Sequence, residues 1–305
     1  MKKKLISSAL LLLTAMIWGF AFVAQVEGME HIGSFTYSAL RFTLGAAVLV
    51  PLIFIFSRKQ SDFKKIQRSF LYGIIGGILL FIPITLQQYA IEFSPDGNSM
   101  KAGFITGLYT VLVPIAYLVF MKRNTPLPVW IGAVLAVLGL YFLCGTGSGS
   151  LHFTDILLFL SVPMWTAQIL FISSIGNKTD IFAYSVSQYA VCGAISLICA
   201  LIFDRGSLFN VSAIGSAFIP IVYGGVCSVS IAYTLQIIGQ KHADPTSASI
   251  IMSTESMFSC IGNLLFLEVN MSILQYVGCG LIFTGIILSQ LVFKKKKLDK
   301  NAVLP

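Results

Sequence analysis

The chain has 305 residues, of which 56% are hydrophobic and only 10% are charged, and its formal net charge at pH 7 is +8. A soluble domain carries roughly a quarter charged residues, so this composition excludes an ordinary soluble protein and indicates a membrane protein. The basic residues are scattered over short segments, which also excludes the single basic face that a nucleic-acid-binding protein needs.

Ten apolar segments follow one another along the chain, each near the roughly 20 residues that a bilayer-spanning helix needs. They are Leu5–Val26, Ile32–Phe56, Phe70–Ile91, Met100–Met121, Pro128–Gly145, Thr154–Ile175, Phe182–Phe203, Ala213–Ile238, Pro245–Leu267 and Ile273–Phe293. They are too long and too continuous for the alternating strands of a membrane β-barrel. The sequence therefore predicts an all-α integral membrane protein with ten transmembrane helices, numbered here as spans 1 to 10.

The chain also repeats itself. At an offset of 147 residues Trp18 falls on Trp165, and at an offset of 146 residues two glycines of span 5 fall on two glycines of span 10. Each copy holds five spans, and a chain that crosses a bilayer five times ends on the far side, so the second copy is expected to be inverted. Two inverted five-helix repeats are typical of secondary transporters. The predicted organisation is a first repeat over residues 1–145, a Gly/Ser-rich linker over 146–153, and a second repeat over 154–305 that ends in a basic tail.

The basic residues indicate the orientation of the spans. Of the 20 Lys and Arg residues, 17 fall in the termini and loops that would share one side of the membrane. Because cytoplasmic loops carry the excess of basic residues, both termini are expected in the cytoplasm and the spans in the cytoplasmic (inner) membrane.

Polar residues inside apolar spans are costly, so their positions are informative. Trp18 and Trp165 lie deep in spans 1 and 6 rather than at the headgroups, and Gln168 shares a helical face with Trp165. Gln87 and Gln236 match at an offset of 149 residues in spans 3 and 8. Two interpretations stay open for these residues: packing between helices, or lining a cavity and binding a polar substrate.

Two ionisable residues lie inside spans. Glu255 is near the middle of span 9, and we expect it to couple protons or contact the substrate; the alternative is a structural carboxylate bonded to neighbouring hydroxyls. Arg41 is about nine residues into span 2. It is interpreted as a structural or coupling charge, which includes the possibility that its long side chain extends outward to the membrane surface.

No pattern of an enzyme is present in the sequence. It has no G-x-x-x-x-G-K-[ST] phosphate loop, no H-E-x-x-H and no G-x-S-x-G. The three histidines fall in predicted loops, and the six cysteines lie inside spans without the spacing of a metal site. The sequence therefore predicts no cofactor and no metal, and it predicts cysteines that pack as small side chains.

Several short motifs resemble those of EamA-type transporters of the drug/metabolite transporter superfamily. They are Trp18-Gly19, Arg41-Phe42, the Lys101–Tyr109 stretch and Glu255. The resemblance covers the whole chain as two tandem repeats. It implies a central cavity lined by spans 1, 3, 4, 6, 8 and 9, with spans 5 and 10 outside. The cavity residues it implies are Trp18, Gln87, Tyr109, Trp165, Gln236 and Glu255.

Two positions depart from the symmetry or from the family pattern. Where the first copy has Arg41 the second has Gln188, so the copies are not chemically equivalent. Family members often have proline directly after the span-9 glutamate, whereas Ser256 follows Glu255 here, so the sequence does not itself predict a break in that helix.

The expected function is secondary transport of a small polar metabolite, most often export in this family, by alternating access. The expected partners are a small-molecule substrate, the lipid bilayer and a coupling proton, with exchange as the other driving force. The alternatives are a passive channel or facilitator for a small solute and an intramembrane enzyme.

Overall fold

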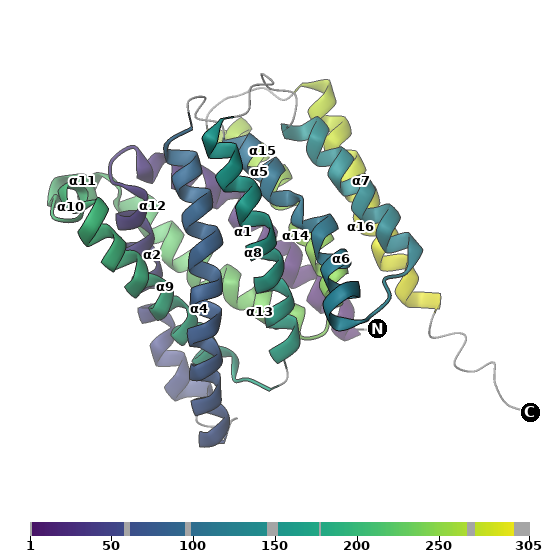
Figure 1. The fold of residues 1–305 in the computed structure, drawn as a ribbon, viewed down its shortest axis with the longest axis horizontal. Helices are drawn as coiled ribbons and strands as arrows, with labels where there is room; N and C mark the ends of the chain where they lie inside the picture. The colour runs from purple at the N-terminus through teal and green to yellow at the C-terminus, as the bar shows by residue number, and fades with distance from the viewer. Residues whose placement is uncertain are drawn as a thin grey trace, which may run out of the picture.

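The computed structural model describes residues 2–57, 62–94, 99–144, 152–176, 178–266 and 272–295. All secondary structure in these ranges is helical (Figure 1). Residues 146–151 of the expected linker, and the tail after residue 295, lie outside the described residues.

The first half of the chain forms the helices of spans 1 to 5. Its elements are α1 (Lys2–Met29), α2 (Ser34–Leu52) continued by the π-helical η1 (Ile53–Ser57), α4 (Phe63–Glu92), α5 (Ser99–Gly107), α6 (Tyr109–Met121) and α7 (Leu127–Cys144). Span 3 begins seven residues earlier than its apolar run because the charged stretch before Phe70 continues the helix. Span 4 is two helices, α5 and α6, separated at Leu108.

The second half has more interruptions. Its elements are α8 (Phe153–Ile175), α9 (Ile181–Phe203), the short α10 (Arg205–Leu208), α11 (Val211–Ser216) and α12 (Phe218–Val222), the π-helical η2 (Tyr223–Tyr233), α13 (Thr234–Gln240), α14 (Pro245–Met252), α15 (Glu255–Phe266) and α16 (Ile273–Lys295). Span 8 is therefore a continuous path from α12 through η2 to α13, and span 9 is broken between α14 and α15.

Local signals explain where several helices begin. The Asp180 side chain accepts a hydrogen bond from the Ala183 backbone N–H at 3.0 Å and caps α9. Asp244 caps α14 in the same way, with Pro245 at the first helical position, where its missing N–H does no harm. The start of α2 is stabilised by a carboxylate that is distant in the sequence. The Asp204 side chain accepts a hydrogen bond from the Thr36 backbone N–H at 3.0 Å.

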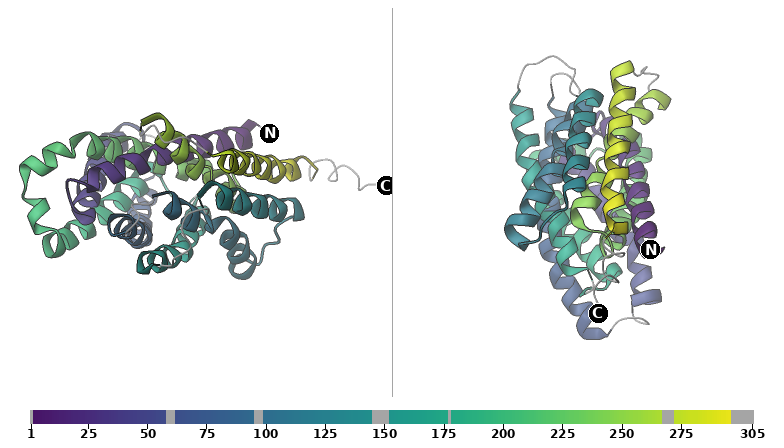
Figure 2. Two further views of the ribbon diagram at one scale, coloured as in Figure 1. Left: turned by 90° about the horizontal axis from the view of Figure 1, so that it is seen from above. Right: turned by 90° about the vertical axis from the view of Figure 1, so that its right-hand side faces the viewer.

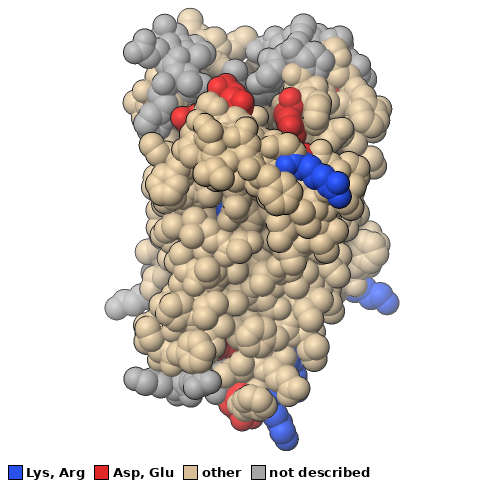
Figure 3. All heavy atoms as spheres, turned by 90° about the vertical axis from the view of Figure 1, so that its left-hand side faces the viewer, with Lys and Arg blue, Asp and Glu red and all other residues tan. Residues whose placement is uncertain are grey.

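The described residues hold seven helices that are long and apolar enough to cross a membrane, and two shorter apolar helices, Leu127–Leu143 and Ile273–Ser289. Large apolar side chains are exposed on the outer faces of α4, α6, α7, α9 and α16. Figure 3 shows a broad belt without acidic or basic side chains on most of one face, and most charges toward its two ends. Such a belt is far larger than a soluble protein exposes and fits a multi-pass membrane protein.

Two pairs of helices at equivalent positions of the two copies run antiparallel. A Cβ added to Gly132 of α7 would come 2.6 Å from the carbonyl oxygen of Gly285 in α16, and one added to Gly139 would come 2.6 Å from that of Gly278. The numbers run in opposite directions, so α7 and α16 are antiparallel, and their backbones approach closely only because these four residues lack side chains. The pair lies at one end of the molecule (Figures 1 and 2).

The second antiparallel pair is α2 and α9. The ring of Phe35 stacks on that of Phe203 with centroids 5.5 Å apart, and Phe56 stacks on Phe182 at 5.6 Å. Between the pairs the halves interleave: α4 packs against α8 and α9, while α1 packs against η2, α13, α14 and α15. The buried centre of the molecule is thus an interface between the two halves. The five cysteines whose side chains the structure describes are free, and Cys192 is fully buried in this interface.

Candidate functional site

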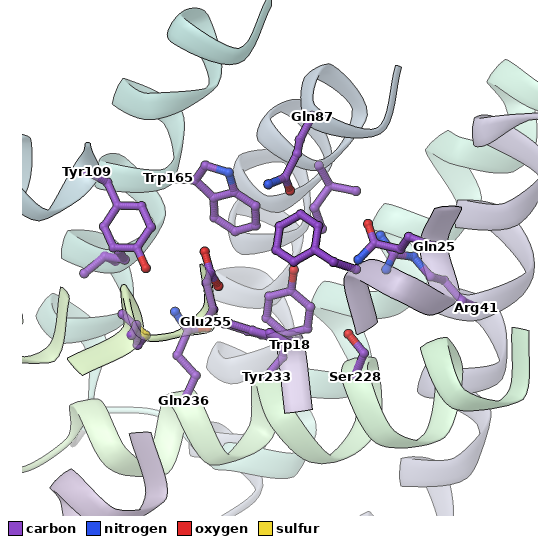
Figure 4. A pocket seen from close by; sticks show the side chains of 14 residues that line it. Trp18, Gln25, Arg41, Gln87, Tyr109, Trp165, Ser228, Tyr233, Gln236 and Glu255 are labelled. Carbon is purple, nitrogen blue, oxygen red and sulfur yellow. The ribbon is translucent and has the colours of Figure 1, made fainter. Parts of the chain in front are cut away.

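A cavity of about 40 Å³, room for roughly three water molecules, lies where the two halves meet. Its wall draws on spans 1, 2, 3, 4, 6, 8 and 9 (Figure 4). The lining residues are Trp18, Phe22, Gln25, Arg41, Ile84, Gln87, Tyr109, Trp165, Ile169, Ser228, Tyr233, Gln236, Met252 and Glu255.

Aromatic rings form the middle of this pocket. Trp18 packs on Tyr233 with ring centroids 4.6 Å apart and an interplanar angle of 57°. Trp165 lies on the wall opposite, nearer Gln87 and Glu255 (Figure 4). Among the described residues, the buried indole N–H groups of Trp18 and Trp165 have no hydrogen-bond partner. Two donors are therefore available to a polar molecule in the pocket.

Glu255 is the acidic member of the pocket, and the structure places it at a break that the sequence did not predict. The Ser253 and Thr254 hydroxyls donate to the carbonyls of Ile250 and Ile251, at 2.8 and 2.7 Å, and α14 ends there. Hydroxyls that bond back to the preceding turn compete with helical bonding, so the break forms without proline. Glu255 then opens α15, where the positive end of the helix dipole favours a carboxylate.

The Glu255 side chain is 8% exposed and points into the pocket (Figure 4). Its neighbour Ser256 faces the other way and donates to the Gly103 carbonyl at 3.1 Å, which joins α15 to α5. The break therefore both delivers the carboxylate to the cavity and fixes the second half of span 9 to span 4.

Arg41 is the basic member, and it does not extend outward to the membrane surface. Its side chain is 3% exposed, with the guanidinium carbon 5.2 Å from the centroid of the Tyr37 ring and 5.0 Å from that of Phe42. These contacts stabilise a desolvated cation. Its Nε has no hydrogen-bond partner among the described residues. Arg41 and Gln25 lie toward one end of the pocket in Figure 4, with Trp18 and Tyr233 between them and Glu255.

Ten of the lining residues form five pairs that are equivalent in the two copies. The pairs are Trp18 with Trp165 and Phe22 with Ile169 at an offset of 147, Ile84 with Tyr233 and Gln87 with Gln236 at 149, and Tyr109 with Glu255 at 146. Tyr109 even opens α6 after the break at Leu108, as Glu255 opens α15. The pocket therefore lies where matching positions of both copies meet.

The remaining four lining residues are one-sided. Gln25, Arg41, Ser228 and Met252 line the pocket, whereas the residues at the equivalent positions do not. Those equivalents are Ile172, Gln188, Leu79 and Thr106.

The structure brings seven of the eight predicted site residues together: Trp18, Arg41, Gln87, Tyr109, Trp165, Gln236 and Glu255. Gln168 does not line the pocket. It is fully buried behind Gln236, and the two amides exchange hydrogen bonds of 3.3 Å in both directions. The site residues selected from the sequence do not include the other seven lining residues, Phe22, Gln25, Ile84, Ile169, Ser228, Tyr233 and Met252. Four of these are apolar residues in apolar spans and so give no signal.

The fold is that of a helical membrane protein with a polar pocket between its two halves. The chain belongs to the EamA-like transporter family, whose model matches residues 5–145 and again residues 152–291. The expected resemblance is thereby confirmed. Among the described residues no group of three or more His, Cys, Asp or Glu side chains could hold a metal ion.

Relatives of known name are also transporters. The threonine/homoserine exporter RhtA of Escherichia coli (strain K12) is 28% identical over 305 residues, which cover 96% of this chain and 95% of that protein. An uncharacterized transporter of Archaeoglobus fulgidus is 26% identical over 298 residues, covering 95% and 87%. A solved crystal structure with 19% identity superposes with a TM-score of 0.75 over 95% of this chain and 98% of that one, a likeness of fold alone.

Proposed function

We propose that the protein is a secondary transporter that exports a small polar metabolite across the cytoplasmic membrane by alternating access, driven by a proton gradient or by exchange. The observation that carries this proposal is the pocket. It is buried between the two copies, is built from five pairs of equivalent positions, and holds one carboxylate and one guanidinium.

Ten membrane crossings in two inverted repeats are part of the proposal. The antiparallel packing of α7 with α16 and of α2 with α9 supports the inversion. α1 begins and α16 ends toward the same end of the molecule (Figure 1), as an even number of crossings requires. The excess of basic residues at that side supports cytoplasmic termini. The end at which α2 begins is then external, and the one-sided residues Gln25 and Arg41 extend the pocket toward it.

The polar character of the pocket supports a polar, charge-bearing substrate. A buried carboxylate and a buried guanidinium are expensive unless each gains a partner, and a solute with groups of both signs would supply both. One relative, RhtA, is named an exporter of threonine and homoserine, two small zwitterions of this kind. L-threonine and L-homoserine are therefore the first compounds to test.

Counterflow in proteoliposomes tests the proposal. Vesicles that hold the full-length protein are loaded with an unlabelled amino acid and diluted into a trace of the same labelled compound, with protein-free vesicles as the control. A carrier accumulates the label transiently above its equilibrium level. The excess of unlabelled solute inside occupies the inward-facing binding sites, so little label is carried back out. A labelled compound that only equilibrates, at a rate that does not saturate, would show a channel or facilitator and contradict the proposal.

A further inference from the structure

Arg41 and Gln188 occupy matching places on either side of the middle of the molecule. Because α2 and α9 are antiparallel and in contact at Phe35–Phe203 and Phe56–Phe182, the step from Gly45 to Ala46 lies level with the step from Cys192 to Gly193. Arg41 is four residues, about 6 Å, from this level toward the start of α2. Gln188 is the same distance from it toward the start of α9.

Their surroundings match as well. Arg41 lies one turn from the buried Tyr37, and its backbone carbonyl oxygen would be 3.0 Å from a Cβ added to Gly225 in span 8. Gln188 lies one turn from the buried Tyr184, and its backbone carbonyl oxygen would be 2.7 Å from a Cβ added to Gly77 in span 3. Each residue thus lies against a glycine of another span. The two spans concerned, span 8 and span 3, are equivalent in the two copies.

The two residues differ in what they contact. Arg41 lines the pocket, whereas Gln188 is 0% exposed and does not. Among the described residues, neither the oxygen nor the nitrogen of the Gln188 amide has a hydrogen-bond partner. Buried amides without partners are rare in folded proteins. Gln240 shares this property, but Gln188 is the one that stands at the equivalent of a pocket residue, which points to a partner that is present in another state.

We propose that Gln188 is a substrate contact in the state of opposite access, in which it takes the place that Arg41 holds here. This assignment rests on the alternating access proposed above. In alternating access one repeat rocks against the other around the site. In an exchange of arrangement between the two halves, the contact between α4 and α9, where Gln188 lies against Gly77, opens. Arg41 then leaves the pocket and Gln188 enters it, and Ile172 likewise replaces Gln25.

The exchange changes the charge of the site. In the arrangement of this structure an anionic group of a bound substrate would meet a guanidinium. In the opposite state it meets a neutral amide that donates one or two hydrogen bonds but carries no charge. The site therefore binds an anionic group more tightly while it faces the start of α2 than while it faces the start of α9.

Sided cysteine labelling tests the assignment without knowledge of the substrate. Arg41→Cys and Gln188→Cys are made singly in the full-length protein and treated with a small charged, membrane-impermeant thiosulfonate in right-side-out and in inverted membrane vesicles. Peptide-resolved mass spectrometry separates the new cysteine from the native ones. Gly206→Cys, in α10 with nothing near its Cβ position, marks the face at which α2 begins. Ala133→Cys, fully buried beside α16, is the unreactive control.

The expected result is that Arg41→Cys reacts from the face of the Gly206→Cys marker and Gln188→Cys from the other face. A second pair, Gln25→Cys and Ile172→Cys, reports the same exchange on α1 and α8, and it serves if Arg41→Cys does not fold. Reaction of Ile172→Cys from the far face while Gln188→Cys stays unreactive would overturn the role of Gln188 and leave the carrier intact.

The other outcomes separate the two proposals. Reaction of Arg41→Cys and Gln188→Cys from both faces would show a path open throughout, which overturns alternating access and the role of Gln188 together. A further outcome is that Ile172→Cys and Gln188→Cys both fail to react from the far face while the marker and Gln25→Cys react normally. That result would also overturn both alternating access and the role of Gln188.

Discussion

The α7–α16 contact and the central pocket are both built from equivalent positions of the two copies, yet they have diverged to different degrees. In the contact, the same glycines stand in both copies, because backbones this close leave no room for a Cβ on either side. In the pocket, Tyr109 of the first copy is matched by Glu255 of the second, and Arg41 by Gln188.

The difference follows from what each region has to fit. Two helices related by a two-fold axis present the same surface to each other, so the same residues serve on both. A metabolite has no such axis, and a pocket that orients it needs different groups at equivalent positions. The carboxylate and the guanidinium that make the pocket asymmetric are therefore the residues whose replacement is expected to have the largest effect.

The largest effect is expected for Glu255→Gln, which removes the pocket's carboxylate with little change of shape. With a pH gradient of one unit, coupling one proton to each substrate supports a concentration ratio of about ten. We expect the variant to lose this ratio and to keep exchange of internal for external substrate, because an amide cannot release a proton. Uptake of labelled L-threonine into proteoliposomes under an imposed pH gradient measures both.

The matched control for Glu255→Gln is Tyr109→Phe, a change of one polar atom at the equivalent position, which should retain the concentration ratio. A Glu255→Gln protein that still builds the ratio would show that the proton is carried elsewhere.

The second effect concerns the sidedness of binding. Arg41→Gln should weaken binding from the face at which α2 begins by about ten- to a hundredfold, the range of a charge-assisted hydrogen bond. Adding Gln188→Arg to this variant moves the charge to the equivalent position and should make binding tighter from the opposite face. Half-saturation of L-threonine transport in right-side-out and inverted vesicles measures the sidedness.

The comparison for the charge exchange is Arg41→Lys, which keeps the charge but not the planar fork and should fall between the wild-type protein and Arg41→Gln. If the double variant transports and retains the sidedness of the wild type, the two positions do not exchange roles.

The third effect tests the symmetric region. Gly139→Val places a branched side chain 2.6 Å from the Gly278 carbonyl oxygen, and overpacking of this kind destabilises by about 1–3 kcal/mol. The melting temperature in detergent should fall, while the affinity for substrate in the folded fraction stays the same because α7 and α16 do not line the pocket. Gly280→Ala on α16, where nothing lies near the Cβ position, should leave both unchanged.

The sequence predicts much of this molecule because hydrocarbon penalises polar groups. The apolar run Thr154–Ile175 predicts α8 to within one residue, and six of the seven residues selected for their polar groups inside spans line the pocket. Tyr109, which only the family resemblance implied, lines it too. Whether they bind substrate stays a prediction.

Other features leave no trace in hydropathy. The breaks at Leu108 and at Ser253-Thr254 depend on local hydrogen bonding within uniformly apolar or hydroxyl-rich stretches, and the π-helical η2 has the same composition as an α-helix. Apolar lining residues such as Phe22 and Ile84 are indistinguishable by type from lipid-facing ones. The polar face of span 6 is also wider than the part of it that lines the pocket. The sequence therefore predicts Gln168 as a lining residue, although it lies behind Gln236.

The smallest effect is expected for substitution of Gln168. This substitution tests whether its hydrogen bonds to Gln236 orient that lining residue. Gln168→Leu leaves the Gln236 amide without its partner, and such bonds between membrane helices contribute about 1 kcal/mol. We expect a half-saturation concentration raised about fivefold, with a small fall in melting temperature, because Gln236 can then rotate away from the substrate. Gln240→Leu is the control, since that buried amide has no partner among the described residues and lies outside the pocket wall. Equal effects of the two substitutions on transport would mean that the amide pair fixes the packing of α8 and α13 and does not orient Gln236.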